Sequence, residues 1–231
     1  MGSLVVPEAL RPWVAGIDVT AAVGAAAVDV PDHATTLVVR TVPEAGRQVV
    51  LMGPRTRAAY HMGEPGPSCV RIRMRPGRAR ELLGRPVRDL ADRAVPVREL
   101  PGLDLDRLVD DPVDALTSVL ADRPVGDDLV AAAAELLTGA NVAGVAERLH
   151  ISERRLRTLF ADGVGLSPKH FARIGRVRRV LLIAPSLRWA DVAASAGYYD
   201  QSHMTAEFRR LMGVPPAAYA AGRRPPARPC G

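Results

Sequence analysis

The chain has 231 residues, of which 48% are hydrophobic and 24% are charged, a composition that excludes a disordered protein and predicts a buried core. No apolar run reaches the roughly 18 residues of a membrane span, and residues 1–10 lack the pattern of a secretion signal, so we expect a cytoplasmic protein with no membrane partner. The two cysteines lie far apart and no Cys or His pair has ligand spacing, so we expect no disulfide framework, metal site or cofactor.

The net charge of +6 is unevenly distributed along the chain. Residues 1–126 hold 16 arginines and 16 acidic residues, whereas residues 127–231 hold 15 basic and 9 acidic residues. A basic C-terminal part beside a neutral N-terminal part predicts a polyanionic partner for the former. Because only Lys169 among the 31 basic residues is a lysine, the codon use of a GC-rich genome is an alternative explanation of the excess.

Residues 19–74 have the patterns of β-strands. Short apolar runs at 36–39 and 49–52 are bounded by Pro and Gly, and residues 69–75 alternate between apolar residues and arginine. The alternation places Arg71, Arg73 and Arg75 on one face, which predicts a solvent-exposed strand face, with an anionic effector as the alternative. A short helix over 78–83, an irregular stretch over 86–101 and helical segments near 103–109 and 112–121 follow.

A cluster of turn residues at 123–126 predicts the domain boundary. Beyond it the pattern is helical, with one helix over 127–137 and a long one from Pro168 to about Ala184. Residues 222–231, with three prolines and three arginines, are expected to form a disordered tail. The predicted fold is therefore α+β. Residues 1–126 form a β-rich domain, a small barrel or cupin-like, and residues 127–221 form an all-α domain of about seven helices.

The helical part contains one pattern twice, 47 residues apart. Val145-Ala146 and Val192-Ala193 each precede a turn residue, His150 or Gly197, which is followed by an apolar residue and a helix-capping Ser152 or Asp200. The turn position favours a left-handed backbone, which Gly adopts freely and His tolerates. The repeat predicts two helix-turn-helix units whose second helices bury one face and leave the other free for the DNA major groove.

Residues 141–219 resemble the DNA-binding domain of the AraC/XylS family of bacterial transcription regulators. The matching motifs are Ser152-x3-Leu156-x2-Leu159-Phe160, Gly165-x-Ser167-Pro168-x2-Phe171, Val192-Ala193-x3-Gly197-Tyr198, Asp200-Gln201-Ser202-His203 and Phe208-Arg209-Arg210-x2-Gly213-Val214-Pro215-Pro216-x2-Tyr219. The resemblance implies a sequence-specific regulator, and no enzyme, with two recognition helices in successive major grooves of double-stranded DNA. The N-terminal part resembles more loosely the β-rich sensor domains of some family members.

The outward positions of the two recognition helices are the candidate DNA contacts. Base reading is predicted for Arg154, Arg157, Thr158, Gln201, Ser202, His203 and Thr205. Phosphate contacts are predicted for Arg155, Arg176, Arg178, Arg179, Arg209 and Arg210. The alternatives are arginines that only solvate a helix face, and a His203 that packs against its neighbours. The short Ala206 stands where some family members have a long basic side chain, which implies looser reading of the second half-site.

No nucleophile–base motif, phosphate loop or paired carboxylates indicate catalysis, and His33 and His61 lack the spacing of a cupin metal pair. Residues 1–126 would sense a small-molecule effector, dimerise or contact RNA polymerase, in a monomer or a homodimer. The alternative function is that of a small-molecule-binding protein or cupin-like enzyme whose helical part serves only in assembly. Steep salt dependence of DNA binding would favour the regulator.

Overall fold

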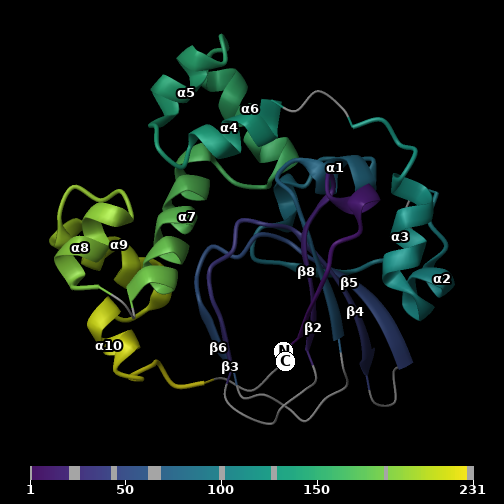
Figure 1. Cartoon of the computed structure of the whole chain (residues 1–231), viewed down its shortest axis with the longest axis horizontal. Helices are drawn as coiled ribbons and strands as arrows, with labels where there is room; N and C mark the ends of the chain where they lie inside the picture. Colours follow the sequence, from purple (N-terminus) through teal and green to yellow (C-terminus); the bar gives the residue numbers. More distant parts are fainter. Residues whose placement is uncertain are drawn as a thin grey trace.

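The chain forms a β-rich part and a helical part that lie side by side (Figure 1). The computed structural model describes residues 2–20, 27–42, 46–61, 69–98, 102–125, 129–184 and 187–227. Within them, one hydrophobic core comprises residues between Leu10 and Leu120, and the other comprises residues between Ala133 and Met212. The predicted α+β fold is confirmed. The predicted boundary at Gly126 lies outside the described residues and stays a prediction.

The β-rich part is built on an antiparallel six-stranded sheet in the order β1-β2-β7-β4-β5-β8, with β1 and β8 at the edges. Its strands are β1 (Gly2–Leu4), β2 (Val14–Thr20), β4 (Thr36–Val42), β5 (Gly46–Met52), β7 (Cys69–Met74) and β8 (Ala94–Pro96). Ile17, Ile72, Leu37 and Leu51 are paired in register across the four central strands and are almost fully buried. These side chains therefore line one face of the sheet and form the centre of its core.

The helices of this part cover the buried face of the sheet, and a second ribbon lies beside it. They are α1 (Arg78–Leu83), α2 (Leu105–Asp110) and α3 (Pro112–Leu120), whose buried Leu82, Leu108 and Leu116 join the core. The ribbon pairs β3 (Ala27–Asp29) with β6 (Ala59–His61). The predicted strands over 36–39, 49–52 and 69–74 and the predicted helices are confirmed.

The expectation of an irregular stretch over 86–101 is wrong for residues 94–96. They form strand β8, which pairs with β5 at the sheet edge. The strand has only three residues and ends in Pro96, so it carries no readable period-2 pattern. Strand β2 also lies mostly before the stretch in which strands were expected.

Two of the three arginines expected on a solvent-exposed face, Arg71 and Arg73, are half-buried and paired with carboxylates. The Arg73 guanidinium donates to both carboxylate oxygens of Asp32, at 3.0 and 2.5 Å, and Arg71 lies 3.7 Å from the Asp29 carboxylate. Arg75 is exposed, yet its Nε donates to the Arg11 carbonyl at 2.6 Å. The expectation is therefore wrong for Arg71 and Arg73, because the chain around β3 brings Asp29 and Asp32 onto this face.

The helical part consists, in its described residues, of seven α-helices. They are α4 (Leu129–Leu136), α5 (Val142–Arg148), α6 (Glu153–Gly163), α7 (Pro168–Ile183), α8 (Trp189–Ser195), α9 (Gln201–Met212) and α10 (Pro216–Ala220). The linker helix α7 runs between the α5–α6 pair and the α8–α9 pair (Figure 1). Its apolar residues Phe171, Ile174, Val177 and Val180 are buried in the shared core. None of the helices described is long and apolar enough to span a membrane.

The C-terminal segment and the two N-terminal histidines have definite neighbours. The Arg224 guanidinium lies 4.8 Å from the centre of the Tyr219 ring, while residues 228–231 of the predicted tail lie outside the described residues.

The centres of the His33 ring and the Phe171 ring of α7 lie 4.2 Å apart, with the ring planes tilted by 32°. The Nε2 of His61 lies 3.5 Å from the Asp29 carboxylate.

Candidate nucleic-acid interface

Helices α5 and α6 form the first helix-turn-helix unit. The turn residue His150 has φ +53°, the left-handed conformation that the sequence predicts at this position. The Ser152 hydroxyl then accepts a hydrogen bond from the Arg155 N–H at 3.1 Å and caps α6. Ala146 of α5 is buried, and Leu156 and Phe160 anchor the inner face of α6. The outer face of α6 is left free.

Helices α8 and α9 repeat this construction in the second unit. Gly197 has φ +80°, and the Asp200 carboxylate accepts from the His203 N–H at 2.7 Å to cap α9. Ala193 is buried at the position that corresponds to Ala146 in the first unit. Met204, Phe208 and Leu211 anchor the inner face of α9. The predicted repeat of turn, cap and buried positions is therefore present in both units.

The residues predicted to read bases lie on the free faces of the recognition helices. Six of the seven are exposed, and Thr205 is half-buried. The exposed six are Arg154, Arg157, Thr158, Gln201, Ser202 and His203. Their contact with DNA stays a prediction, but every one of the exposed six is accessible to a partner.

Local contacts hold several of these side chains in the free protein. Arg157 forms an ion pair with Glu153 one turn earlier, and the Thr158 hydroxyl donates to the Arg154 carbonyl at 3.1 Å. The His203 ring packs edge to face against the Tyr198 ring, with 5.4 Å between the ring centres, so His203 also serves as a packing residue. To reach a base, Arg157 must leave Glu153, an exposed pair worth about 0.5 kcal/mol.

The arginines predicted to contact phosphates divide into two groups. Arg155, Arg179, Arg209 and Arg210 are exposed. Arg176 and Arg178 are half-buried and engaged within the protein: Arg176 binds Glu207, and Arg178 lies 3.2 Å from the carboxylate of Asp32. The phosphate role of all six stays a prediction, and for the latter two it competes with an internal ion pair.

Glu207 is the buried centre of a charged cluster that the sequence reading missed. Its carboxylate, 6% exposed, accepts from Arg176 at 2.8 Å, from Arg173 at 3.2 Å and from the Tyr198 hydroxyl at 3.0 Å. Burial and the neighbouring Glu207 charge raise the pKa of Tyr198 above its ordinary value, so this hydroxyl remains a donor. The available signal was an acidic residue between Met204 and Phe208 on the inner face of α9.

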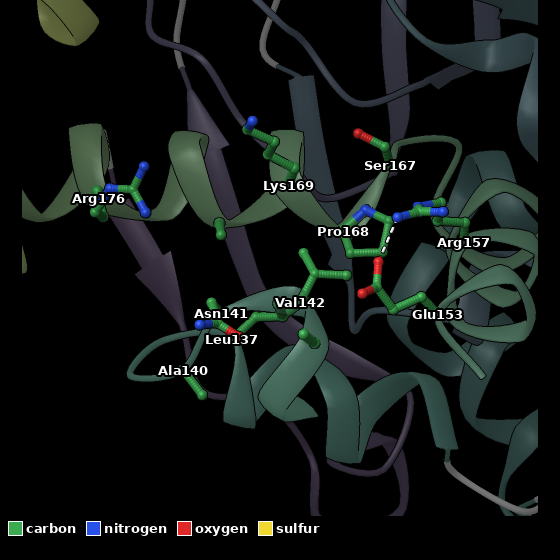
Figure 2. A pocket seen from close by; sticks show the side chains of 12 residues that line it. Leu137, Ala140, Asn141, Val142, Glu153, Arg157, Ser167, Pro168, Lys169 and Arg176 are labelled. Carbon is green, nitrogen blue, oxygen red and sulfur yellow. Dashed lines mark hydrogen bonds and ion pairs between the residues drawn. The ribbon is translucent and has the colours of Figure 1, made fainter. Parts of the chain in front are cut away.

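A hollow of about 620 Å³ lies between the first unit and the start of α7 (Figure 2). Arg157 comes to it from α6, and Lys169 and Arg176 come from α7 (Figure 2). Lys169 is exposed in the first turn of α7, where the positive end of the helix dipole also attracts anions. Sequence reading noted Lys169 only as the single lysine, although its place directly after Ser167-Pro168 marked it as a first-turn residue.

Known proteins match the helical part. Residues 145–222 match the model of a helix-turn-helix domain. The HTH-type transcriptional activator RhaR of Pectobacterium atrosepticum is 35% identical over 75 residues, which are 32% of this chain and 26% of RhaR. RhaR of Yersinia pseudotuberculosis is 31% identical over 96 residues, 40% of this chain and 33% of that protein. The chain thus spans about a quarter to a third of the length of these curated relatives.

Two solved structures are also similar. The DNA-binding domain of AdpA, a global transcriptional factor, in complex with a target DNA is 28% identical, with a TM-score of 0.37. It covers 41% of this chain and 88% of the AdpA chain. ToxT from Vibrio cholerae is 9% identical, covers 88% of this chain and 97% of its own, and has a TM-score of 0.45.

The helical part is therefore similar to helix-turn-helix domains, and it contains two helix-turn-helix units joined by the linker helix α7. The matches at residues 145–222 agree with the resemblance to the DNA-binding domain of the AraC/XylS family that the motifs of residues 141–219 indicate.

Proposed function

We propose that this protein is a transcription regulator that binds double-stranded DNA in a sequence-specific way. The observation that carries the proposal is the duplicated recognition helix. Both α6 and α9 are capped and anchored on the inner face, and six of the seven positions predicted to read bases are exposed. Such a helix fits the major groove, which is about 12 Å wide. A DNA partner also favours a cytoplasmic location.

The linker helix supports binding to two successive major grooves by one chain. Helix α7 has 16 residues, which corresponds to about 24 Å at 1.5 Å per residue. Together with the turns at its ends, it can separate two recognition helices by about 34 Å, one turn of duplex. The proposed binding site therefore has two half-sites whose centres are about 10 base pairs apart.

Selection of bound sequences from random duplex DNA, with the full chain, tests this function. We expect enriched sites with two half-sites at this spacing, and a log–log slope of affinity against salt near −0.9 for each phosphate neutralised. Weak binding without sequence preference at any salt would contradict the regulator and favour a helical part that serves in assembly.

We further propose that the N-terminal part controls DNA binding in response to an anionic effector. A cavity of about 480 Å³ lies between the two parts. Arg73 and Arg75 line it from the β-rich side, and Phe171, Arg178 and Arg179 line it from α7. Arginines beside an aromatic ring suit an organic anion. Screening carboxylates for a change in melting temperature, with Arg179→Ala as the variant that should lose the response, tests this role. RNA polymerase contact and homodimer formation remain alternative roles.

A further inference from the structure

We infer that the N-terminal part braces both recognition helices and so sets the half-site spacing that the protein accepts. This inference rests on the proposed function. Its first support is at the end of α9, where two carbonyls accept hydrogen bonds from the β-rich part. The Ala58 N–H donates to the Leu211 carbonyl at 2.8 Å, and the Tyr60 hydroxyl donates to the Met212 carbonyl at 2.6 Å. These carbonyls lie in the last turn of α9, where a backbone carbonyl has no N–H partner within the helix.

The end of α6 is held in the same manner by a different segment. The Val87 N–H donates to the Asp162 carbonyl at 2.9 Å, and the Asp162 carboxylate pairs with Arg88. Gly165, just beyond the helix, lies so close to the same segment that an added Cβ would be 2.7 Å from the Val87 carbonyl oxygen. The close approach requires a glycine here, so this contact is tightly packed.

A third contact holds the linker helix between these two ends. Arg178 in α7 donates to the Pro31 carbonyl at 3.3 Å and lies 3.2 Å from the carboxylate of Asp32, which also binds Arg73 of the sheet. One folded part therefore contacts the first recognition helix, the linker and the second recognition helix. The relative position of α6 and α9 depends on these contacts as well as on the length of α7.

The contacts that the N-terminal part makes with α6, α7 and α9, here called the brace, leave the predicted reading surface free. Its contacts fall on the last turn of each recognition helix, at Asp162 in α6 and at Leu211 and Met212 in α9. The residues predicted to read bases lie nearer the helix starts, between 154 and 158 and between 201 and 205. The contacts can therefore position the two helices while DNA is bound, and Tyr60 and Arg88 are positioning residues rather than DNA contacts.

The test measures how affinity depends on the distance between half-sites. One inserted base pair rotates the second half-site by about 34° and moves it about 3.4 Å along the duplex. Both units can then engage only if a brace contact breaks. We expect the full wild-type chain to lose affinity at least about tenfold on such DNA. Tyr60→Phe and Arg88→Ala have already lost one contact, so each should show a penalty smaller by about threefold, with affinity for the unaltered site changed less than about twofold.

Two matched variants control for loss of a phenol or of a charge. Tyr219→Phe removes a hydroxyl from a ring that packs on Phe208 within the helical part, and Arg85→Ala removes an exposed arginine three residues from Arg88. Both should keep the wild-type penalty. Equal penalties in all five proteins, or an equal loss by the Tyr60 and Arg88 variants at both spacings, would overturn the brace. Absence of sequence-preferring binding by the wild type at every spacing would instead overturn the proposed function.

Discussion

The carboxylate of Glu207 in the second recognition helix accepts three hydrogen bonds from the guanidinium of Arg176 in the linker helix, at 3.2, 2.8 and 3.0 Å. The carboxylate is almost fully buried, whereas the arginine is partly exposed. This pair joins the second helix-turn-helix unit to the helix that separates it from the first. An arginine predicted to contact phosphate thus has a structural partner in the free protein.

Glu207→Gln should lower the free energy of unfolding by about 2 kcal/mol, because the buried acceptor for two arginines and the Tyr198 hydroxyl loses its charge. Urea denaturation of the full chain followed by circular dichroism measures the change. The matched control is Glu153→Gln, which removes an exposed carboxylate paired with Arg157 and should cost less than about 0.5 kcal/mol. Equal losses in both variants would show that the buried cluster contributes nothing special.

Arg157→Ala should relax base preference in one half-site and weaken binding to the preferred sequence by about 1–3 kcal/mol, because an exposed arginine on α6 can pair with guanine. Fluorescence anisotropy on the preferred duplex and on duplexes with each base replaced gives both quantities. A uniform loss on every duplex would make Arg157 a phosphate contact instead.

Arg179→Ala should weaken binding to all sequences alike and make the log–log salt slope shallower by about one, because Arg179 is exposed on α7. Arg178→Ala is the comparison on the same helix. We expect it to change the salt slope less, since Arg178 is engaged by Asp32. Equal changes in slope would mean that Arg178 leaves its ion pair and binds phosphate.

The protein should lose stability as the pH falls from about 6.5 to about 4, because of His33. Burial lowers the pKa of His33 to about 4, although the Asp32 charge acts in the opposite direction. The unfolded chain binds this proton near pH 6.5, so the stabilisation is complete above that value and declines by up to about 3 kcal/mol as the pH approaches 4. Asp32, whose pKa is lowered, adds its own loss only below about pH 4.

Urea unfolding at pH 7, 5.5 and 4.5 measures this dependence. His33→Phe can still stack on Phe171 and should show a flatter profile than the wild type. His203→Gln, a change at an exposed histidine, should keep the wild-type profile. A steep profile in the His33 variant would assign the acid sensitivity to other groups.

The first half-site should carry more sequence information than the second. Helix α6 exposes Arg154, Arg155 and Arg157 near its start, whereas the first two turns of α9 expose shorter side chains and the small Ala206. Arginines read guanine strongly, so we expect guanine-containing preferences in the first half-site and looser ones in the second. The information content of each half-site among selected sequences decides this. Equal content, or more in the second half-site, contradicts the asymmetry.

The helix-turn-helix units could be predicted from the sequence because their determinants are local. His150 and Gly197 in left-handed turns, the caps Ser152 and Asp200, and the buried apolar positions all act within about a dozen residues of one another. Local geometry of this kind repeats wherever the pattern repeats. The alternating strand over 69–74 was predictable for the same reason, since its side chains alternate with period two.

Contacts between residues far apart in sequence were decided only by the tertiary structure. Nothing near Arg178 indicates that Asp32 will bind it, and nothing near Tyr60 indicates that its hydroxyl will meet the Met212 carbonyl, 152 residues away. An exposed arginine and an engaged arginine have the same local pattern on a helix. The sequence alone determined which two helices carry the pattern of a recognition helix. The packing of the two parts determined which side chains remain free and how these two helices are held, because burial and charge pairing depend on neighbours that only the folded chain brings together.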